Sequence, residues 1–147
     1  MTYLLDVNVI IALIDPRHVF HQLAHDWFST EGQASWATCP LTENGAVRIL
    51  GHARYPGGPG RPAAAAALVD GLRRHPNHQF WGDDISLFST ETVRLDAIAT
   101  AAQVTDTYLL ALARERGGML ATLDQRLSPS AVRDGTAALA MIGSGSA

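Results

Sequence analysis

Short apolar runs alternate along the chain with longer segments whose apolar residues recur every three or four positions. The short runs have the length of buried strands, and they cover residues 3–5, 35–38, 78–81, 119–122 and 138–142. The longer segments have helical periodicity, and they cover residues 7–13, 18–29, 42–50, 62–75, 92–101 and 105–116. Strands that alternate with helices favour a parallel sheet covered on both faces. We therefore predict an α/β fold of three layers, α/β/α, around a central, mainly parallel sheet.

Local signals predict where several helices begin. Thr42 and Thr105 are each expected to cap a helix, and Ser128 before Pro129 is expected to begin another short one. With 147 residues the chain has the length of one domain. We expect a single domain over 1–142, followed by a flexible Gly/Ser tail at 143–147.

Composition narrows the class of protein. Hydrophobic residues make up 47% and the net charge is -3, which excludes disorder of the whole chain. No apolar run reaches the ~18–20 residues that cross a bilayer. The first apolar stretch has no basic region before it and is interrupted by Asp6, so we expect neither a signal peptide nor an anchor, and a cytoplasmic location. A single cysteine, Cys39, excludes an internal disulfide framework and a multi-thiolate zinc site.

The absence of lysine excludes three further classes of protein. All eleven basic residues are arginine. A P-loop, a protein kinase and a Schiff-base enzyme each require a lysine, so none of these chemistries is available to this chain.

Four carboxylates are expected at one edge of the predicted sheet. Asp6 directly follows the first predicted strand and Asp124 follows the strand at 119–122, whereas Glu43 and Asp106 fall in the first turns of helices. Any one of them alone could be a turn residue or could complement a helix dipole. Together they would repel one another, and with no lysine available a divalent ion would neutralise them best. Oxygen ligands select Mg²⁺ or Mn²⁺, which suit phosphodiester hydrolysis.

The segments around these acids resemble the four acidic motifs of PIN-domain ribonucleases, especially the toxin component of VapBC toxin–antitoxin systems. The segments are Leu4-Leu5-Asp6-Val7-Asn8-Val9, Leu41-Thr42-Glu43-Asn44-Gly45, Val104-Thr105-Asp106-Thr107-Tyr108-Leu109 and Ala121-Thr122-Leu123-Asp124. Their order and spacing fit the family over nearly the whole chain. The resemblance implies a PIN-like fold and an endoribonuclease that depends on Mg²⁺ or Mn²⁺.

The resemblance also assigns roles to residues. It carries Asp6, Glu43, Asp106 and Asp124 over as catalytic, metal-binding acids, with Asn8, Thr105 and Thr122 as supporting residues. A metal-activated water would attack the phosphate in line, the 3′-oxygen would leave, and the product would carry a 5′-phosphate. One departure matters: many relatives carry a further Asp where this chain has Arg126, which leaves a second metal ion in doubt.

Further partners follow from the same resemblance. It implies a homodimer, an RNA substrate and a VapB-type antitoxin that covers the acidic pocket and alone binds DNA. No membrane partner is expected. Candidate RNA contacts are Arg48, Arg54, Arg61 and Arg126. The negative net charge predicts modest non-specific affinity, so recognition should rest on RNA shape and unpaired loops.

The residues also suggest two other functions, and each is disfavoured by a feature of the sequence. In the first, Asp6 is the nucleophile of a phosphoryl-transfer domain, but such domains normally need a lysine near the phosphoryl group. In the second, the chain is a catalytically silent binding module, which the complete set of acids disfavours. The segment His21-Gln22-Leu23-Ala24-His25 resembles a zinc-protease helix, but glutamine cannot replace its general base, so we expect an exposed helix face there.

Overall fold

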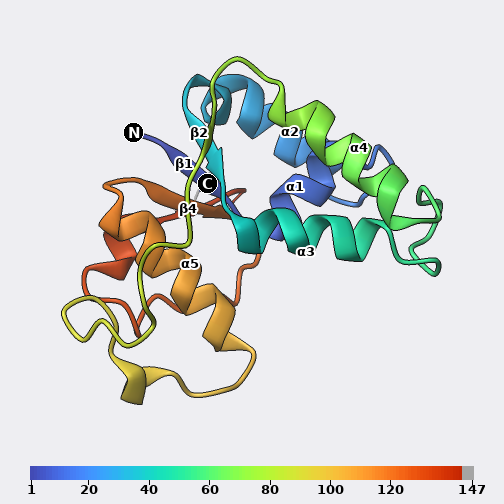
Figure 1. The fold of residues 1–147 in the computed structure, drawn as a ribbon. Coiled ribbons are helices and arrows are strands. Elements are labelled where there is room, and N and C mark those ends of the chain that lie inside the picture. The colour runs from blue at the N-terminus through green and yellow to red at the C-terminus, as the bar shows by residue number, and fades with distance from the viewer. Residues whose placement is uncertain (144–147) are drawn as a thin grey trace.

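A five-stranded parallel sheet forms the centre of the molecule (Figure 1). The computed structural model describes residues 1–143, so the tail predicted at 143–147 lies, except for Gly143, outside the described residues. The strand order is β3-β2-β1-β4-β5. The strands are β1 (Tyr3–Leu5), β2 (Trp36–Thr38), β3 (His78–Phe80), β4 (Met119–Thr122) and β5 (Leu139–Met141). Every pairing is parallel, so all the strands end at the same edge of the sheet.

Helices cover both faces of this sheet, which confirms the predicted three-layer fold. On one face lie α1 (Val7–Ile14), α2 (His21–Thr30), α3 (Pro40–Leu50) and α4 (Pro62–Arg73), and on the other lies α5 (Gln103–Glu115). Alternate residues of the strands face the two layers. Leu5 and Trp36 pack with α1–α4, whereas Leu4 and Leu120 pack with α5. The core is therefore split by the sheet into two apolar clusters.

Two predicted helices are wrong. Residues 92–101 contain only a short 3₁₀ helix, Leu95–Ala97, and no helix begins at Ser128; the next helical segment is the 3₁₀ helix Gly135–Ala138. The two segments pair with each other instead. Val93 bridges Val132 in antiparallel fashion, and the neighbouring backbone amides donate across the same pair of segments. These long-range bonds satisfy backbone groups that a local helix would otherwise have to satisfy.

Two helices begin earlier than predicted. The α3 helix begins at Pro40, and the hydroxyl of Thr42 accepts a hydrogen bond from the backbone amide of Cys39, so Thr42 is the third residue of a capping box. The α5 helix begins at Gln103, which leaves Thr105 exposed inside its first turn. Gln103 Oε1 accepts bonds from the amides of Ala99 and Thr100, which ties the first residue of α5 to the segment before it, and among the described residues no side chain caps the helix.

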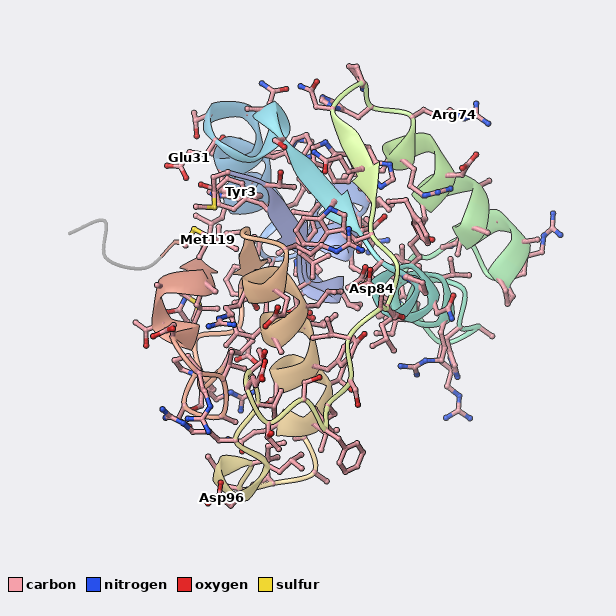
Figure 2. The ribbon with its side chains drawn as sticks, turned by 60° about the vertical axis from the view of Figure 1, so that its left-hand side comes forward. Tyr3, Glu31, Arg74, Asp84, Asp96 and Met119 are labelled. Carbon is pink, nitrogen blue, oxygen red and sulfur yellow. The ribbon has the colours of Figure 1, made fainter. Side chains whose placement is uncertain are left out.

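A long irregular segment connects β3 to α5. Figure 2 shows it passing Asp84 beside α3 and continuing to Asp96 at the far end of the molecule. It then turns back into the first turn of α5, close to the carboxyl edge of the sheet. Among the described residues, no helix is both long and apolar enough to span a bilayer.

Candidate active site

Asp6 is the most enclosed acid of the site. It follows β1 directly and is the N-cap of α1, where its Oδ1 accepts a hydrogen bond of 2.8 Å from the amide of Val7. Its Oδ2 accepts a second bond of 2.8 Å from the hydroxyl of Thr122 at the end of β4. Only 6% of Asp6 is exposed, and this burial raises its pKa above the ordinary value. Both carboxylate oxygens are thus held in a fixed orientation.

Asp106 and Asp124 complete a group of three acids. Burial, together with the charges of Asp6 and Asp124, raises the pKa of Asp106 to about 6. Asp124 is tied to the same edge because its backbone amide donates to the Thr122 hydroxyl at 3.1 Å. Thr122 therefore connects Asp6 and Asp124, and Asp124 lines one cavity together with Asp106.

Glu43 has different partners. Its Oε2 accepts a hydrogen bond of 2.7 Å from Thr38 at the end of β2, and the same oxygen lies 2.8 Å from Nε of Arg73, the last residue of α4. The Thr38 hydroxyl also lies 2.7 Å from Nε2 of His78. Trp36 and Thr38 project from the same face of β2, the face that packs against α1–α4. The structure thus engages Glu43 in an ion pair on the α4 side, and its charge is not among those that raise the pKa of Asp6 or Asp106.

The acids match a divalent ion in donor type and charge. Three carboxylates that repel one another are stabilised by a hard cation, and Mg²⁺ is commonly held by one or two carboxylates together with waters and substrate phosphates. Within residues 1–143, no group of three or more His, Cys, Asp or Glu side chains has a geometry that would hold a metal ion. The acids match a divalent ion in chemistry, but their side chains are not preorganised as a metal site.

The remaining predicted residues divide into two groups. Arg126 lies at the acids: its backbone amide donates to Asp124 Oδ1 at 2.9 Å, and its Nε is 3.7 Å from that oxygen. Asn8 and Thr105 are exposed in the first turns of α1 and α5. Arg48 and Arg54 line one shallow surface hollow at the end of α3, and Arg61 caps α4. Of the candidate RNA contacts, the structure thus brings Arg126 to the acids and places the others between the last turn of α3 and the start of α4.

The histidines of α2 do not form the exposed face that we expected. His21 Nδ1 lies 2.7 Å from the carbonyl of Ala12, and His25 Nε2 lies 3.0 Å from that of Leu13. Their rings pack 4.3 Å apart. Both side chains therefore satisfy carbonyls at the end of α1, which gives them a structural role.

The sequence did not predict the roles of two residues near the acids. Arg73 could not be assigned to Glu43 because nothing in the local sequence couples the end of α4 to the start of α3. Gln103 did carry a signal: Thr100 followed three residues later by Gln103 has the spacing of a capping box.

Comparison with known proteins agrees with this geometry. The family model described as "PIN domain" matches residues 3–131. The chain is 42% identical over 131 residues to Ribonuclease VapC39 of Mycobacterium tuberculosis, covering 89% of this chain and 94% of that protein. It is 37% identical over 139 residues to Ribonuclease VapC44 of the same organism, covering 92% and 95%.

A solved structure shows the same fold. The crystal structure of Mycobacterium tuberculosis VapC20, described as a sarcin-ricin loop cleaving toxin, superposes with a TM-score of 0.58 at 13% identity, over 78% of this chain and 83% of that one. The chain therefore belongs to the PIN-domain family, and its curated relatives place it among the VapC proteins within that family.

Proposed function

We propose that this chain is a metal-dependent endoribonuclease that acts as the toxin of a toxin–antitoxin pair. The observation that carries the proposal is the Thr122 hydroxyl at the end of β4, which bonds Asp6 and the backbone of Asp124, beside the cavity that Asp124 and Asp106 line. Ligands of parallel α/β sheets bind at the carboxyl edge of the sheet. The names of the relatives, which describe ribonucleases, support RNA as the substrate.

The three aspartates would hold a Mg²⁺ or Mn²⁺ ion. When bound, such an ion neutralises the acids, polarises a phosphoryl oxygen and makes a water more acidic. Asp6 would bind in the orientation set by Val7 and Thr122. Asp106 approaches from α5 and Asp124 from the loop after β4, so the ion would be reached from three separate elements.

Glu43 is the fourth proposed ligand. Its carboxylate would reach the ion either through a water or by leaving Arg73, whose Nε lies 2.8 Å away in a pair that is only partly exposed to solvent. Thr38 would then remain its one local anchor. Asn8 and Thr105, which are exposed close to Asp6 and Asp106 in sequence, are placed to contact solvent or RNA at the mouth of the site.

In the proposed reaction the nucleophile is a water molecule and not a side chain of the protein. Cys39 cannot take that part, because burial raises the pKa of its thiol to about 11 and keeps it protonated. Attack by water with departure of the 3′-oxygen would give a 5′-phosphate product and would not require the RNA 2′-hydroxyl. We further propose the partners typical of such toxins: a second copy of the chain and a VapB-type antitoxin that covers the acids.

The test compares Asp6→Asn with wild-type protein. The variant keeps an oxygen that accepts from the Val7 amide, but its Nδ2 can only donate to the Thr122 hydroxyl, and the charge is lost. We expect a folded protein by circular dichroism, no RNA cleavage and no growth inhibition on expression in bacteria. Asp26→Asn, on the exposed face of α2, is the matched control and should behave as wild type. Mapping new 5′ ends in cellular RNA identifies the substrate, and wild-type cleavage by Asp6→Asn would contradict the proposal.

A further inference from the structure

A cavity of about 290 Å³ opens directly beside the acids. Asp106 and Asp124 form one wall, Gln103 from the first turn of α5 forms another, and Arg126, Leu127 and Ser128 close it from the loop after β4. Ligand cavities in proteins are ~300–1,000 Å³, so this one has room for a single small ligand group and not for a helix or duplex. It is continuous with the proposed active site because two acids belong to both.

Arg126 supplies a positive charge at the mouth of this cavity. Its side chain is 94% exposed, and its Nε is 3.7 Å from Asp124 Oδ1, a loose contact. Its backbone is fixed, because its amide donates to the same carboxylate at 2.9 Å. The guanidinium is therefore anchored at its base and unconstrained at its tip, which suits contact with a phosphate that approaches the acids.

Gln103 lines the cavity, and its side-chain amide is free only to donate hydrogen bonds there. Its Oε1 accepts bonds of 2.8 and 3.2 Å from the amides of Ala99 and Thr100. The acceptor is thereby occupied, and the side chain is left with its two N–H donors. A group that can only donate favours a partner that presents an acceptor.

We propose that this cavity holds the base of one unpaired nucleotide next to the scissile phosphate, with Arg126 on the phosphate and Gln103 on the base. The inference rests on the proposed function and deepens it. Guanine and uracil present a carbonyl oxygen where adenine and cytosine present an amino group. Gln103 would donate to O6 of guanine or O4 of uracil, the positions at which adenine and cytosine carry an amino group, and Leu127 lines the cavity beside it.

The first experiment measures binding of the four 5′-nucleoside monophosphates and of guanosine to the full chain in Mg²⁺, by NMR titration. Wild-type protein should show shifts at residues 103 and 126–128, with GMP and UMP binding roughly three- to tenfold more tightly than AMP and CMP. Arg126→Ala should weaken all four nucleotides about tenfold and leave guanosine unchanged, because only the phosphate contact is lost. Arg74→Ala removes a similarly exposed arginine from the outer end of α4 and should change nothing (Figure 2).

The second experiment separates the base contact from the fold. Gln103→Glu keeps an oxygen that accepts from Ala99 and Thr100 but has no N–H to donate. We expect this variant to keep its melting temperature and to lose the preference for GMP and UMP. Gln103→Ala should lose both the preference and the bonds from Ala99 and Thr100, so it should also melt earlier.

The outcomes discriminate between this inference and the proposed function. Equal affinity for the four nucleotides, or an Arg126→Ala variant that binds them as wild type does, overturns the nucleotide site even if RNA is cleaved in an Asp6-dependent manner. Selective nucleotide binding without any RNA cleavage supports the site and contradicts the nuclease. Cleavage products that begin or end at guanine or uracil in wild type, and at any base in Gln103→Glu, support both.

Discussion

At Asp106, ionisation opposes folding. Its pKa is raised to about 6 by burial and by the neighbouring charges of Asp6 and Asp124, whereas an unfolded chain would ionise the same group near its ordinary value of 3.8. The folded protein therefore binds more protons than the unfolded chain between these two values. The free energy of unfolding must fall as pH rises through this window, and the whole penalty is present above pH 6.

This predicts that Asp106→Asn stabilises the metal-free protein at neutral pH. Asparagine resembles the protonated acid and never ionises, so the variant should melt at a higher temperature than wild type at pH 7.5 and at nearly the same temperature at pH 4. The difference is expected to be about 1 kcal/mol, because the half-exposed group is screened by solvent. Thermal melts in EDTA across pH 4–8 measure it. An advantage that is constant with pH would show that charge is not the cause.

The pairing of Glu43 with Arg73 leads to a second prediction at this scale. If Glu43 joins the ion, Arg73 competes for it, so Arg73→Ala should raise the affinity for Mn²⁺ a few-fold as measured by calorimetry. Arg74→Ala, beside it on α4, bonds only Asp70 in the structure and is the matched control. An unchanged affinity in Arg73→Ala would place Glu43 outside the metal site and leave the three aspartates as its ligands.

The two kinds of acid also differ in how far sequence could predict them. Asp6 and Asp124 follow strands, so the topology of a parallel sheet alone brings them to one edge. Glu43 lies on a helix, and the direction of its side chain depends on its ion pair with Arg73 of α4. That partner lies thirty residues further along the chain, and no local rule selects it.

Among the elements, the contact of α1 with α3 controls the position of Asp6. A methyl group added at Gly45 of α3 would lie 2.8 Å from Cγ2 of Val7, the residue that follows Asp6. No real contact is so short, so Val7 would have to move. Gly45 therefore permits a close approach of the two helices that position Asp6 and Glu43.

We predict that Gly45→Ala destabilises the protein and Gly71→Ala does not. Overpacking costs ~1–3 kcal/mol, and this should exceed the ~1 kcal/mol that alanine gains over glycine in a helix. Gly71, inside α4, has open space at the same position and should become more stable by ~0.5–1 kcal/mol. Urea denaturation measures both. In a Val7→Ala background the penalty at Gly45 should disappear, and its persistence there would argue against this contact.

The elements that sequence predicted well are those with strong local patterns. Buried runs and amphipathic periods located the five strands and the five α-helices of the described residues, because burial of a face is encoded by spacing within one element. Residues 92–101 and the segment after Ser128 failed for the opposite reason. Val93 and Val132 acquire their structure from each other, and their pairing depends on the path of the whole chain.

For the whole molecule, metal binding and folding should be coupled. The three aspartates come from the beginning and the last third of the chain, and only the assembled sheet brings them together. An ion that binds them stabilises the folded state alone, by RT ln(1 + [L]/Kd), or ~2.7 kcal/mol at a hundredfold excess over Kd. In a protein of this size that amount corresponds to a rise of ~5–10 °C in melting temperature.

The coupling has a pH dependence that identifies the ligands. We expect Mn²⁺ to raise the melting temperature by this amount at pH 7.5 and by much less at pH 5, where Asp106, with a pKa of about 6, is mostly protonated and an ion must displace the proton. Differential scanning fluorimetry with and without EDTA measures the shift. Asp6→Asn should abolish it, and Asp26→Asn should keep it. A shift of equal size in Asp6→Asn, or one that does not change with pH, would place the ion elsewhere on the protein.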